Sequence, residues 1–219
     1  LIDLPGGPGG AGIIQRGWLT ARRVRGAAFG ALALGVLCGA PALFRAPLPI
    51  LAIGALGVLG TLGYSGRPFG WKYRTLGDLA VLALCGPGMT LGMSWAAFGR
   101  GGLAPWLLGG YFGLLAVAIL HANNLEDREL DRRRGAVTVA QQLGARGGRA
   151  YFVLLYLVAF ALPPLAWWLG VIGPIAAFLP LVGLPVVALP PNRLRAAQTH
   201  LLLGVLFLLH PVYGLIAVG

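Results

Sequence analysis

The sequence has few charged residues and very few acids. Only 11% of its 219 residues are charged, whereas a water-soluble domain carries about 25%. Six Asp and Glu stand against 17 Lys and Arg, and two cysteines are too few for a disulfide scaffold. Apolar residues make up 58%, and the mean hydropathy is +0.81. This composition excludes a soluble enzyme and a disordered chain, and it predicts an all-α, polytopic transmembrane bundle.

Long apolar runs divide the chain into candidate membrane spans. A spanning helix needs about 20 mostly apolar residues, and seven runs approach that length. We interpret the whole chain, 1–219, as a single transmembrane domain. The predicted spans are about 26–44, 48–64, 78–98, 105–123, 149–170, 172–190 and 197–218.

The cations lie almost entirely on one side of these spans. If the spans alternate in direction, all of the 17 Lys and Arg except Arg45 and Arg100 share the side of residues 1–25. Positive residues mark cytoplasmic loops, so residues 1–25 and the basic and acidic loops are predicted to be cytoplasmic, with the protein in the inner (plasma) membrane. The cations are interspersed between apolar runs, which argues against a nucleic-acid partner.

Most of the acids fall in one short segment. Glu126, Asp127, Glu129 and Asp131 lie close together, and Asn123, Asp127 and Asp131 recur every four residues. On a helix these three line one face, about 6 Å apart along the axis. Mg²⁺ takes one or two carboxylates and completes its shell with waters and phosphates. The triplet therefore predicts a Mg²⁺–diphosphate site, and the alternative is a solvated helix end with local Arg–acid pairs, which we favour for Glu126 and Glu129.

A second loop brings cations to the same side. Tyr64 opens it, and Arg67, Lys72 and Arg74 follow within a few residues. Such cations can hold a diphosphate and stabilise the charge that develops as it leaves. For this loop alone, membrane orientation is the stronger explanation. The diphosphate interpretation gains from both loops being at one end of one bundle.

Two further polar residues lie at the membrane edge. Asp78 starts a predicted span, where it either complements the helix dipole or has a function, as intramembrane acids commonly do. His121 precedes the acids by about one turn and is a candidate substrate contact. The sequence has no phosphate-binding Walker loop, zinc-ligand spacing or serine-hydrolase elbow.

Three segments resemble the UbiA superfamily of intramembrane aromatic prenyltransferases, and most closely its branch that prenylates 1,4-dihydroxy-2-naphthoate in menaquinone synthesis. They are Asn123–Gly144, Lys72–Leu79 with Gly86 and Pro87 further on, and Ile13–Thr20. The resemblance implies a nine-helix fold in which the seven spans correspond to helices three to nine. We therefore expect the first two helices, and most of a first Asp-rich motif, to precede Leu1. A protein truly without that motif would be inactive.

The resemblance also implies roles for single residues. The implied ligands of a Mg²⁺ cofactor are Asn123, Asp127, Asp131 and Asp3, the last as a remnant of the first motif. The candidate substrate contacts are Tyr64, Arg67, Lys72, Arg74, His121, Asn123 and Asn124. The candidate catalytic residues are Lys72, Asp78, Asp127 and Asp131, with Asp78 orienting or deprotonating the aromatic acceptor.

The implied reaction transfers a polyprenyl group from its diphosphate to 1,4-dihydroxy-2-naphthoate, with loss of the carboxylate, to give a demethylmenaquinol. One alternative is another UbiA-type enzyme acting on 4-hydroxybenzoate, homogentisate, a haem or a sugar phosphate. The other is a transporter, which would need polar residues at mid-membrane, and the predicted spans hold few. The lipid bilayer is an expected partner, and no obligate protein partner is inferred.

Overall fold

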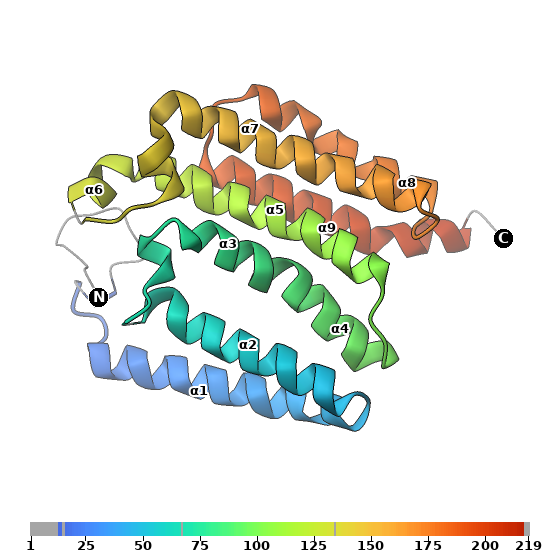
Figure 1. The fold of residues 1–219 in the computed structure, drawn as a ribbon, viewed down its shortest axis with the longest axis horizontal. Helices are drawn as coiled ribbons and strands as arrows, with labels where there is room; N and C mark the ends of the chain where they lie inside the picture. Colours follow the sequence, from blue (N-terminus) through green and yellow to red (C-terminus); the bar gives the residue numbers. More distant parts are fainter. Residues whose placement is uncertain (1–12, 15, 67, 134, 217–219) are drawn as a thin grey trace.

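The computed structural model describes residues 13–14, 16–66, 68–133 and 135–216, apart from the side chains of residue 65 and residues 208–216. Every regular element in these residues is helical, which confirms the predicted fold class (Figure 1). In chain order the elements are α1 (Ala21–Gly39), η1 (Ala40–Phe44), α2 (Pro47–Ser65), η2 (Trp71–Tyr73), α3 (Leu76–Ala83), η3 (Leu84–Gly88), α4 (Met89–Phe98), α5 (Leu103–Glu126), α6 (Arg128–Arg133), α7 (Val139–Trp168), α8 (Pro174–Phe178), η4 (Leu179–Ala188) and α9 (Arg193–Ile216).

Five helical segments in the described residues are long and apolar enough to cross a membrane, so the polytopic prediction is confirmed. They coincide with the first five predicted spans, and the ends differ most at α7, which begins at Val139 instead of near residue 149. The Thr138 side chain accepts a hydrogen bond from the Gln141 N–H and so caps this earlier start. The five segments are Ala21–Phe44, Pro47–Tyr64, Leu76–Phe98, Leu103–Glu126 and Val139–Trp168.

The sixth predicted span, 172–190, is a shorter broken segment, Pro174–Ala188. It begins as the 5-residue helix α8 and continues as the 10-residue 3₁₀ helix η4. Because a 3₁₀ helix rises about 2.0 Å per residue and an α-helix about 1.5 Å, this segment is about 27 Å long. That length approaches the bilayer's hydrocarbon core of about 30 Å. The seventh predicted span, 197–218, corresponds to most of α9, whose described residues end at Ile216.

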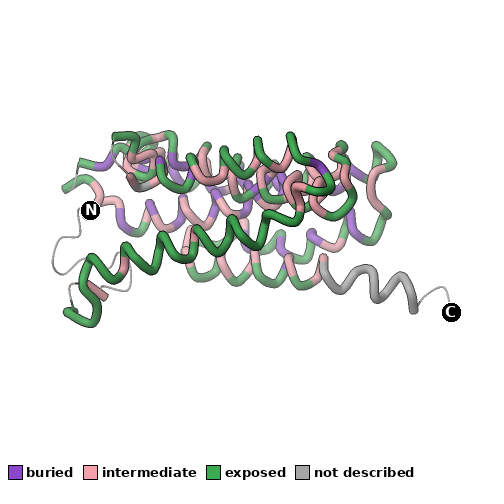
Figure 2. Tube along the Cα trace, turned by 90° about the horizontal axis from the view of Figure 1, so that it is seen from below, coloured by how far each residue is buried: buried purple, intermediate pink, exposed green. Residues whose placement is uncertain are grey.

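Helix α5 forms the centre of the bundle. It packs against α3, η3, α4, α7 and α9, and its side chains Tyr111 and Leu115 are fully buried together with Phe152 and Tyr156 of α7. By contrast, α1 has no buried residue. In Figure 2 this helix is drawn mostly in green, and the purple buried positions belong to other segments. An apolar surface of this kind suits contact with lipid.

Glycines bring α5 into backbone contact with η3. Residues 84–88 form a π-helical turn around Pro87, and Gly86 there adopts non-helical angles (φ −105°, ψ −110°). A Cβ atom on Gly109 of α5 would stand 2.7 Å from the Pro87 Cα, and one on Gly113 would stand 3.0 Å from the Gly86 Cα. Small residues four apart allow helices to approach this closely in a membrane.

This contact gives a prediction about stability. Gly109→Leu is expected to lower the free energy of unfolding in detergent by about 3 kcal/mol, the upper end of the usual range for overpacking, because the Pro87 backbone beside it cannot move aside as a side chain could. Gly54→Leu, on α2 where nothing lies within 4 Å, is the control and should leave stability unchanged. The check is the thermal unfolding midpoint of the two purified variants. Equal midpoints for both would show that the α5–η3 contact is not close.

Candidate functional site

The predicted metal-binding face lies across the junction of α5 and α6. Asp127 stands between the two helices (φ −90°, ψ 7°). The Asp127 N–H donates to the Asn123 carbonyl at 2.9 Å, and the Asp131 N–H donates to the Asp127 carbonyl at 2.8 Å. Because both bonds are of the helical i to i+4 type, the three residues keep the one-face register that their spacing predicts.

All three members of this triplet are at least partly shielded from solvent. The Asp127 residue is 9% exposed, and Asn123 and Asp131 are half-buried. The Asn123 Oδ1 accepts a hydrogen bond from the Arg193 Nη1 at 3.0 Å. Arg193 also bonds Glu126 twice, through its Nε at 3.1 Å and its backbone N–H at 2.8 Å. In the sequence, Arg193 is one of the cations that the positive-inside rule alone could explain. In the structure it ties the start of α9 to the end of α5.

The neighbouring acid Glu129 belongs to the solvated surface. It pairs with Arg132 at 3.0 Å and with Arg133 at 3.2 Å, and all three side chains are exposed. The hydrogen bond from Arg133 and the nearby charge of Arg132 hold the pKa of the Glu129 carboxyl below its usual value. The local Arg–acid pairing predicted for this residue is confirmed. For Glu126 the partner is different, because its arginine comes from α9.

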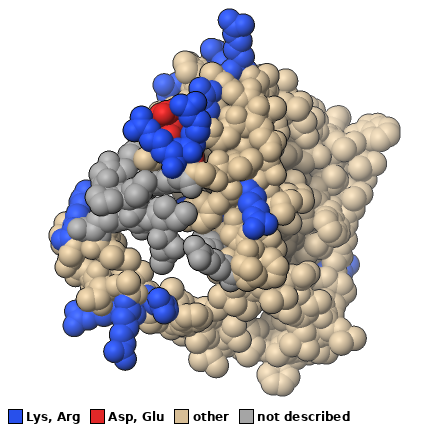
Figure 3. Space-filling model, turned by 60° about the vertical axis from the view of Figure 1, so that its left-hand side comes forward, with Lys and Arg blue, Asp and Glu red and all other residues tan. Residues whose placement is uncertain are grey.

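The basic loop reaches the acidic segment through the backbone. The Val137 N–H, just after α6, donates to the Tyr73 carbonyl of η2 at 2.9 Å. Lys72 and Arg74 flank Tyr73 and are exposed, with the Lys72 Nζ 5.7 Å from the Tyr73 ring centre. Figure 3 shows Lys and Arg gathered around the visible acids at this end. The predicted convergence of the two loops is confirmed, while Arg67 and Asp3 lie outside the described residues.

The start of α7 closes over the junction between α5 and α6. The Gln141 Nε2 donates to the Arg128 carbonyl, and Gly144 then takes a conformation that only glycine adopts readily (φ +67°, ψ −170°). This bend inside α7 lets residues 139–143 turn back toward α6. The segment Asn123–Gly144, which carries part of the family resemblance in the sequence, thus ends at a backbone position that requires glycine.

An apolar cavity of about 540 Å³ opens beside the acidic segment. Its walls come from α2, α3, α5 and α9, and its polar lining residues are Tyr64, Asn123 and Arg193. The complete lining is Tyr64, Val81, Ala116, Ile119, Leu120, Asn123, Arg193, Leu194 and Ala197. The cavity therefore joins an apolar interior to the Asn123 end of the candidate metal-binding triplet, and Tyr64, a candidate substrate contact, lines it.

A buried polar cluster connects α3, α5 and α7. Asp78 is 6% exposed and His121 is 0% exposed, and the His121 Nδ1 lies 3.9 Å from the Asp78 Oδ2, too far for a direct hydrogen bond. The His121 Nε2 lies 2.9 Å from the Gly148 carbonyl, to which it donates, so in a neutral ring Nδ1 is an acceptor. Tyr151 is a hydrogen-bond partner of Asp78, and its ring packs edge-on against His121.

This cluster contains two buried acceptors that lack a donor. Among the described residues, neither the Asp78 Oδ2 nor the His121 Nδ1 has a hydrogen-bond partner, although both atoms are buried. Unsatisfied buried acceptors are costly; a water could donate to both, and a hydroxyl could donate to one of them. Asp78 is also in electrostatic contact with Tyr64, which lines the cavity. Asn124, another predicted substrate contact, is buried on α5.

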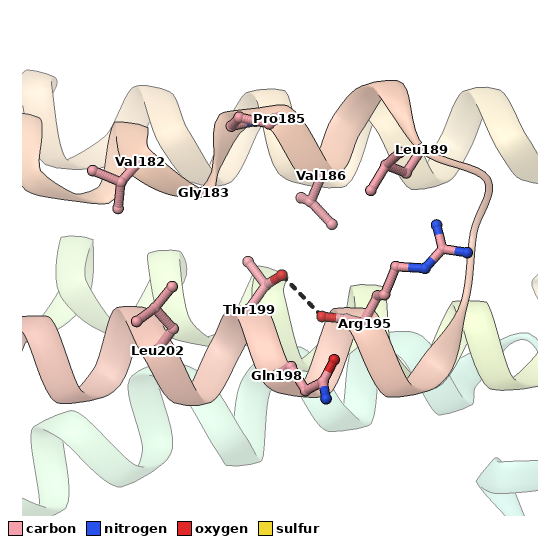
Figure 4. Close-up of a pocket in the computed structure, with 9 residues that line it drawn as sticks. All are labelled: Val182, Gly183, Pro185, Val186, Leu189, Arg195, Gln198, Thr199 and Leu202. Carbon is pink, nitrogen blue, oxygen red and sulfur yellow. Dashed lines mark hydrogen bonds between the residues drawn. The ribbon is translucent and has the colours of Figure 1, made fainter.

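A second, smaller cavity of about 240 Å³ lies between α9 and η4. Figure 4 shows Arg195 extending from α9 toward η4 beside Leu189, and the Thr199 hydroxyl donating to the Arg195 carbonyl at 2.9 Å. The walls are otherwise mostly apolar. Arg193 and Arg195 are two residues apart on one helix, yet they line different cavities.

The donor set suits Mg²⁺ better than a softer metal. Among the described residues, no three His, Cys, Asp or Glu side chains gather into a metal-binding group. Asn123, Asp127 and Asp131 instead offer one amide and two carboxylates in helical register, which fits an ion that keeps several waters and takes phosphate oxygens. The partly buried Asp127 carboxylate is the most protected of these ligands.

The chain is similar to known proteins along most of its length. Residues 13–198 match the model of the UbiA prenyltransferase family. The UbiA prenyltransferase domain-containing protein 1 homolog of Drosophila melanogaster is 35% identical over 59% of the chain and 35% of its own length. The human UbiA prenyltransferase domain-containing protein 1 is 30% identical over 84% of the chain and 56% of its own length.

A bacterial relative matches a shorter stretch. The 1,4-dihydroxy-2-naphthoate octaprenyltransferase of Haemophilus influenzae is 40% identical over 42% of the chain and 30% of its own length. The chain thus spans roughly a third to just over half of the length of these curated relatives. No solved structure matches the chain.

Proposed function

The chain belongs to the UbiA prenyltransferase family, and we propose that it transfers a polyprenyl group from its diphosphate to 1,4-dihydroxy-2-naphthoate within the membrane. The observation that carries this proposal is the apolar cavity whose polar end is Asn123 of the acidic triplet. A prenyl diphosphate is an amphiphile, and it needs such a site: an apolar space for its chain beside a charged end for its phosphates.

At the charged end, one loop would bind the metal ion and the other would contact the diphosphate directly. Asn123, Asp127 and Asp131 would hold Mg²⁺ on the diphosphate, and Lys72 and Arg74 would approach its outer oxygens from the basic loop. Arg67 and Asp3 belong to the same proposal from sequence alone. Mg²⁺ would supply positive charge that stabilises the leaving diphosphate. The Val137–Tyr73 backbone bond at 2.9 Å supports this division, because it holds the two loops together.

The transfer step balances without a further reactant. The bond between the first prenyl carbon and the diphosphate oxygen breaks, and the diphosphate keeps the electron pair. The ring carbon that bears the carboxylate attacks the allylic cation with an electron pair of the ring. The bond from that carbon to the carboxylate then breaks, carbon dioxide leaves, and the released pair restores the aromatic ring. The apolar walls exclude water, which would otherwise capture the cation.

At the acceptor end, Asp78 is the proposed catalytic acid–base residue. Its Oδ2 and the His121 Nδ1 are buried acceptors without a partner among the described residues, and a hydroxyl of the aromatic acceptor could donate its proton to the Asp78 Oδ2. Binding there would orient the ring toward the cavity along Tyr64, and Asp78 would take the hydroxyl proton as the ring attacks and return it as carbon dioxide leaves. Tyr151, which no sequence pattern indicated, would hold the Asp78 carboxylate in place.

Two observations support naphthoate as the acceptor. The Lys72–Leu79 segment resembles the naphthoate branch, and the Haemophilus naphthoate enzyme shares 40% identity over 96 residues. The competing acceptors are 4-hydroxybenzoate and homogentisate. A transporter would need polar residues at mid-membrane, and it is disfavoured because the predicted spans hold few of them. We further propose that this end faces the cytoplasm, with the protein in the plasma membrane, since it carries most of the cations.

An acceptor panel tests this proposal. Membranes containing the full-length protein receive a labelled prenyl diphosphate, Mg²⁺ and one acceptor at a time. We expect a prenylated product with 1,4-dihydroxy-2-naphthoate and about a hundredfold less with the other two acceptors, because their single rings offer less apolar surface than the two fused rings of naphthoate. With naphthoate labelled in its carboxyl group, one labelled carbon dioxide should leave per product. Product from 4-hydroxybenzoate alone would contradict the naphthoate assignment, and no product from any acceptor would contradict prenyl transfer.

A further inference from the structure

Arg193 has more polar contacts than a residue needs if it only sets the orientation of the protein in the membrane. Its guanidinium bonds the Asn123 Oδ1 at 3.0 Å and the Glu126 carboxylate at 3.1 Å, and it lines the 540 Å³ cavity. Among the described residues, the guanidinium of its neighbour Arg195 has a single contact, 3.5 Å from the Pro190 carbonyl, and lies at the other cavity. Of these two arginines on one helix, only Arg193 reaches the site where phosphates would bind.

The contact with Asn123 conflicts with metal binding at the same oxygen. A guanidinium 3.0 Å from Asn123 Oδ1 would stand within a few ångströms of a Mg²⁺ ion on that oxygen, and two like charges at that distance repel strongly in a shielded site. A diphosphate removes the conflict, because its oxygens can bind the metal and the guanidinium together. Arginine matches phosphate geometry well, with two parallel N–H donors.

We propose that Arg193 is a diphosphate-binding residue, which the free protein holds on Glu126 and Asn123 and which moves to a phosphate oxygen when the Mg²⁺–diphosphate enters. This inference rests on the proposed function. The Glu126 bond to the Arg193 backbone N–H, at 2.8 Å, does not involve the guanidinium. The start of α9 therefore stays attached to α5 while the side chain changes partners.

The competing explanation is a purely structural ion pair between α5 and α9. The two explanations predict opposite effects of Glu126→Gln on the affinity for diphosphate. If the pair is structural, loss of either partner harms the site, so Glu126→Gln and Arg193→Gln weaken diphosphate binding together. If Glu126 holds Arg193 away from the diphosphate, Glu126→Gln frees the guanidinium and binding becomes tighter. Glutamine keeps an oxygen for the backbone N–H, so the helix attachment is retained.

The experiment measures binding of inorganic pyrophosphate in the presence of Mg²⁺, by titration calorimetry on the full-length protein in detergent. Arg193→Gln is expected to weaken binding by about tenfold or more, the value of a charge-assisted hydrogen bond. Glu126→Gln is expected to tighten it about two- to fivefold, the value of releasing a partly exposed ion pair. Arg195→Gln and Glu129→Gln are the matched controls for a change of charge near the site, and both should bind as the wild type does.

The double variant identifies the residue that mediates the effect. In the Arg193→Gln background, Glu126→Gln should no longer tighten binding, because no guanidinium remains to be released. The inference is overturned if Arg193→Gln binds pyrophosphate as Arg195→Gln does, if Glu126→Gln weakens binding, or if its tightening persists in the double variant. A wild-type protein that shows no Mg²⁺-dependent pyrophosphate binding would instead contradict the proposed function itself.

Discussion

Asp127→Asn and Asp131→Asn are each expected to lower Mg²⁺-dependent prenyl transfer by about a thousandfold, the upper range for loss of one group that stabilises developing charge. Each substitution keeps the side-chain volume and removes one carboxylate from the triplet. The hydrogen bonds from Asp127 to Asn123 and from Asp131 to Asp127 join main-chain atoms, so neither side-chain substitution removes them. The loss should therefore come from the metal and not from the helix. The measurement is the initial rate of labelled product formation in membranes.

Glu129→Gln is the matched control for this pair. It lies two residues from each aspartate, but it is exposed and paired with Arg132 and Arg133. Exposed pairs of this kind contribute little, so transfer should stay within about twofold of the wild type. Full activity in either aspartate variant, or an equal loss in Glu129→Gln, would contradict the assignment of the metal ligands.

Asp78→Asn should reduce kcat by about 10²–10⁴-fold, the usual contribution of a positioned acid–base group. The asparagine fills the same space between Tyr151 and His121 but cannot take a proton from the acceptor. Since Asp78 belongs to the acceptor end, the affinity for Mg²⁺ and pyrophosphate should be unchanged, which also shows that the variant is folded. Single-turnover rates and calorimetric titration check the two halves of this prediction.

Tyr151→Phe separates catalysis from support in the same cluster. It removes the hydroxyl beside Asp78 but leaves the carboxylate, so we expect a loss of about tenfold, the lower end for one hydrogen bond to a charged group. If Asp78→Asn loses pyrophosphate affinity together with turnover, Asp78 is a structural residue of the bundle. If Asp78→Asn retains wild-type turnover, the acceptor is held elsewhere.

Local patterns predicted the helices and the acidic face. Long apolar runs indicated the spans, and the four-residue spacing of Asn123, Asp127 and Asp131 holds across the α5–α6 junction because the i to i+4 bonds continue through it. Because successive spans alternate in direction, the sequence also predicted that the acidic and basic loops lie at the same end of the bundle. The starts of α1, α3, α7 and α9 indeed lie at the same end as α6 (Figure 1).

Contacts between distant segments were beyond local patterns. Arg193 meets Asn123 across 70 residues of sequence, and a lone arginine after a span fits the orientation rule equally well. His121 was noted for its distance from the acids, but its pairing with Asp78 and Tyr151 depends on how α3 and α7 pack against α5. The broken α8–η4 segment was read as an ordinary span, since hydropathy does not register the change from α to 3₁₀ winding at Pro180 and Pro185.

The central claim is that the α5–α6 junction holds a divalent metal on a prenyl diphosphate. Mn²⁺ in place of Mg²⁺ makes this directly visible, because electron–nuclear double resonance detects phosphorus bound through oxygen to the metal. With geranyl diphosphate and no acceptor, we predict a ³¹P coupling in the full-length protein that disappears when Asp127 and Asp131 are both changed to Asn. A spectrum of free aqueous Mn²⁺ from the wild-type protein, or a coupling that survives in the double variant, would contradict the account.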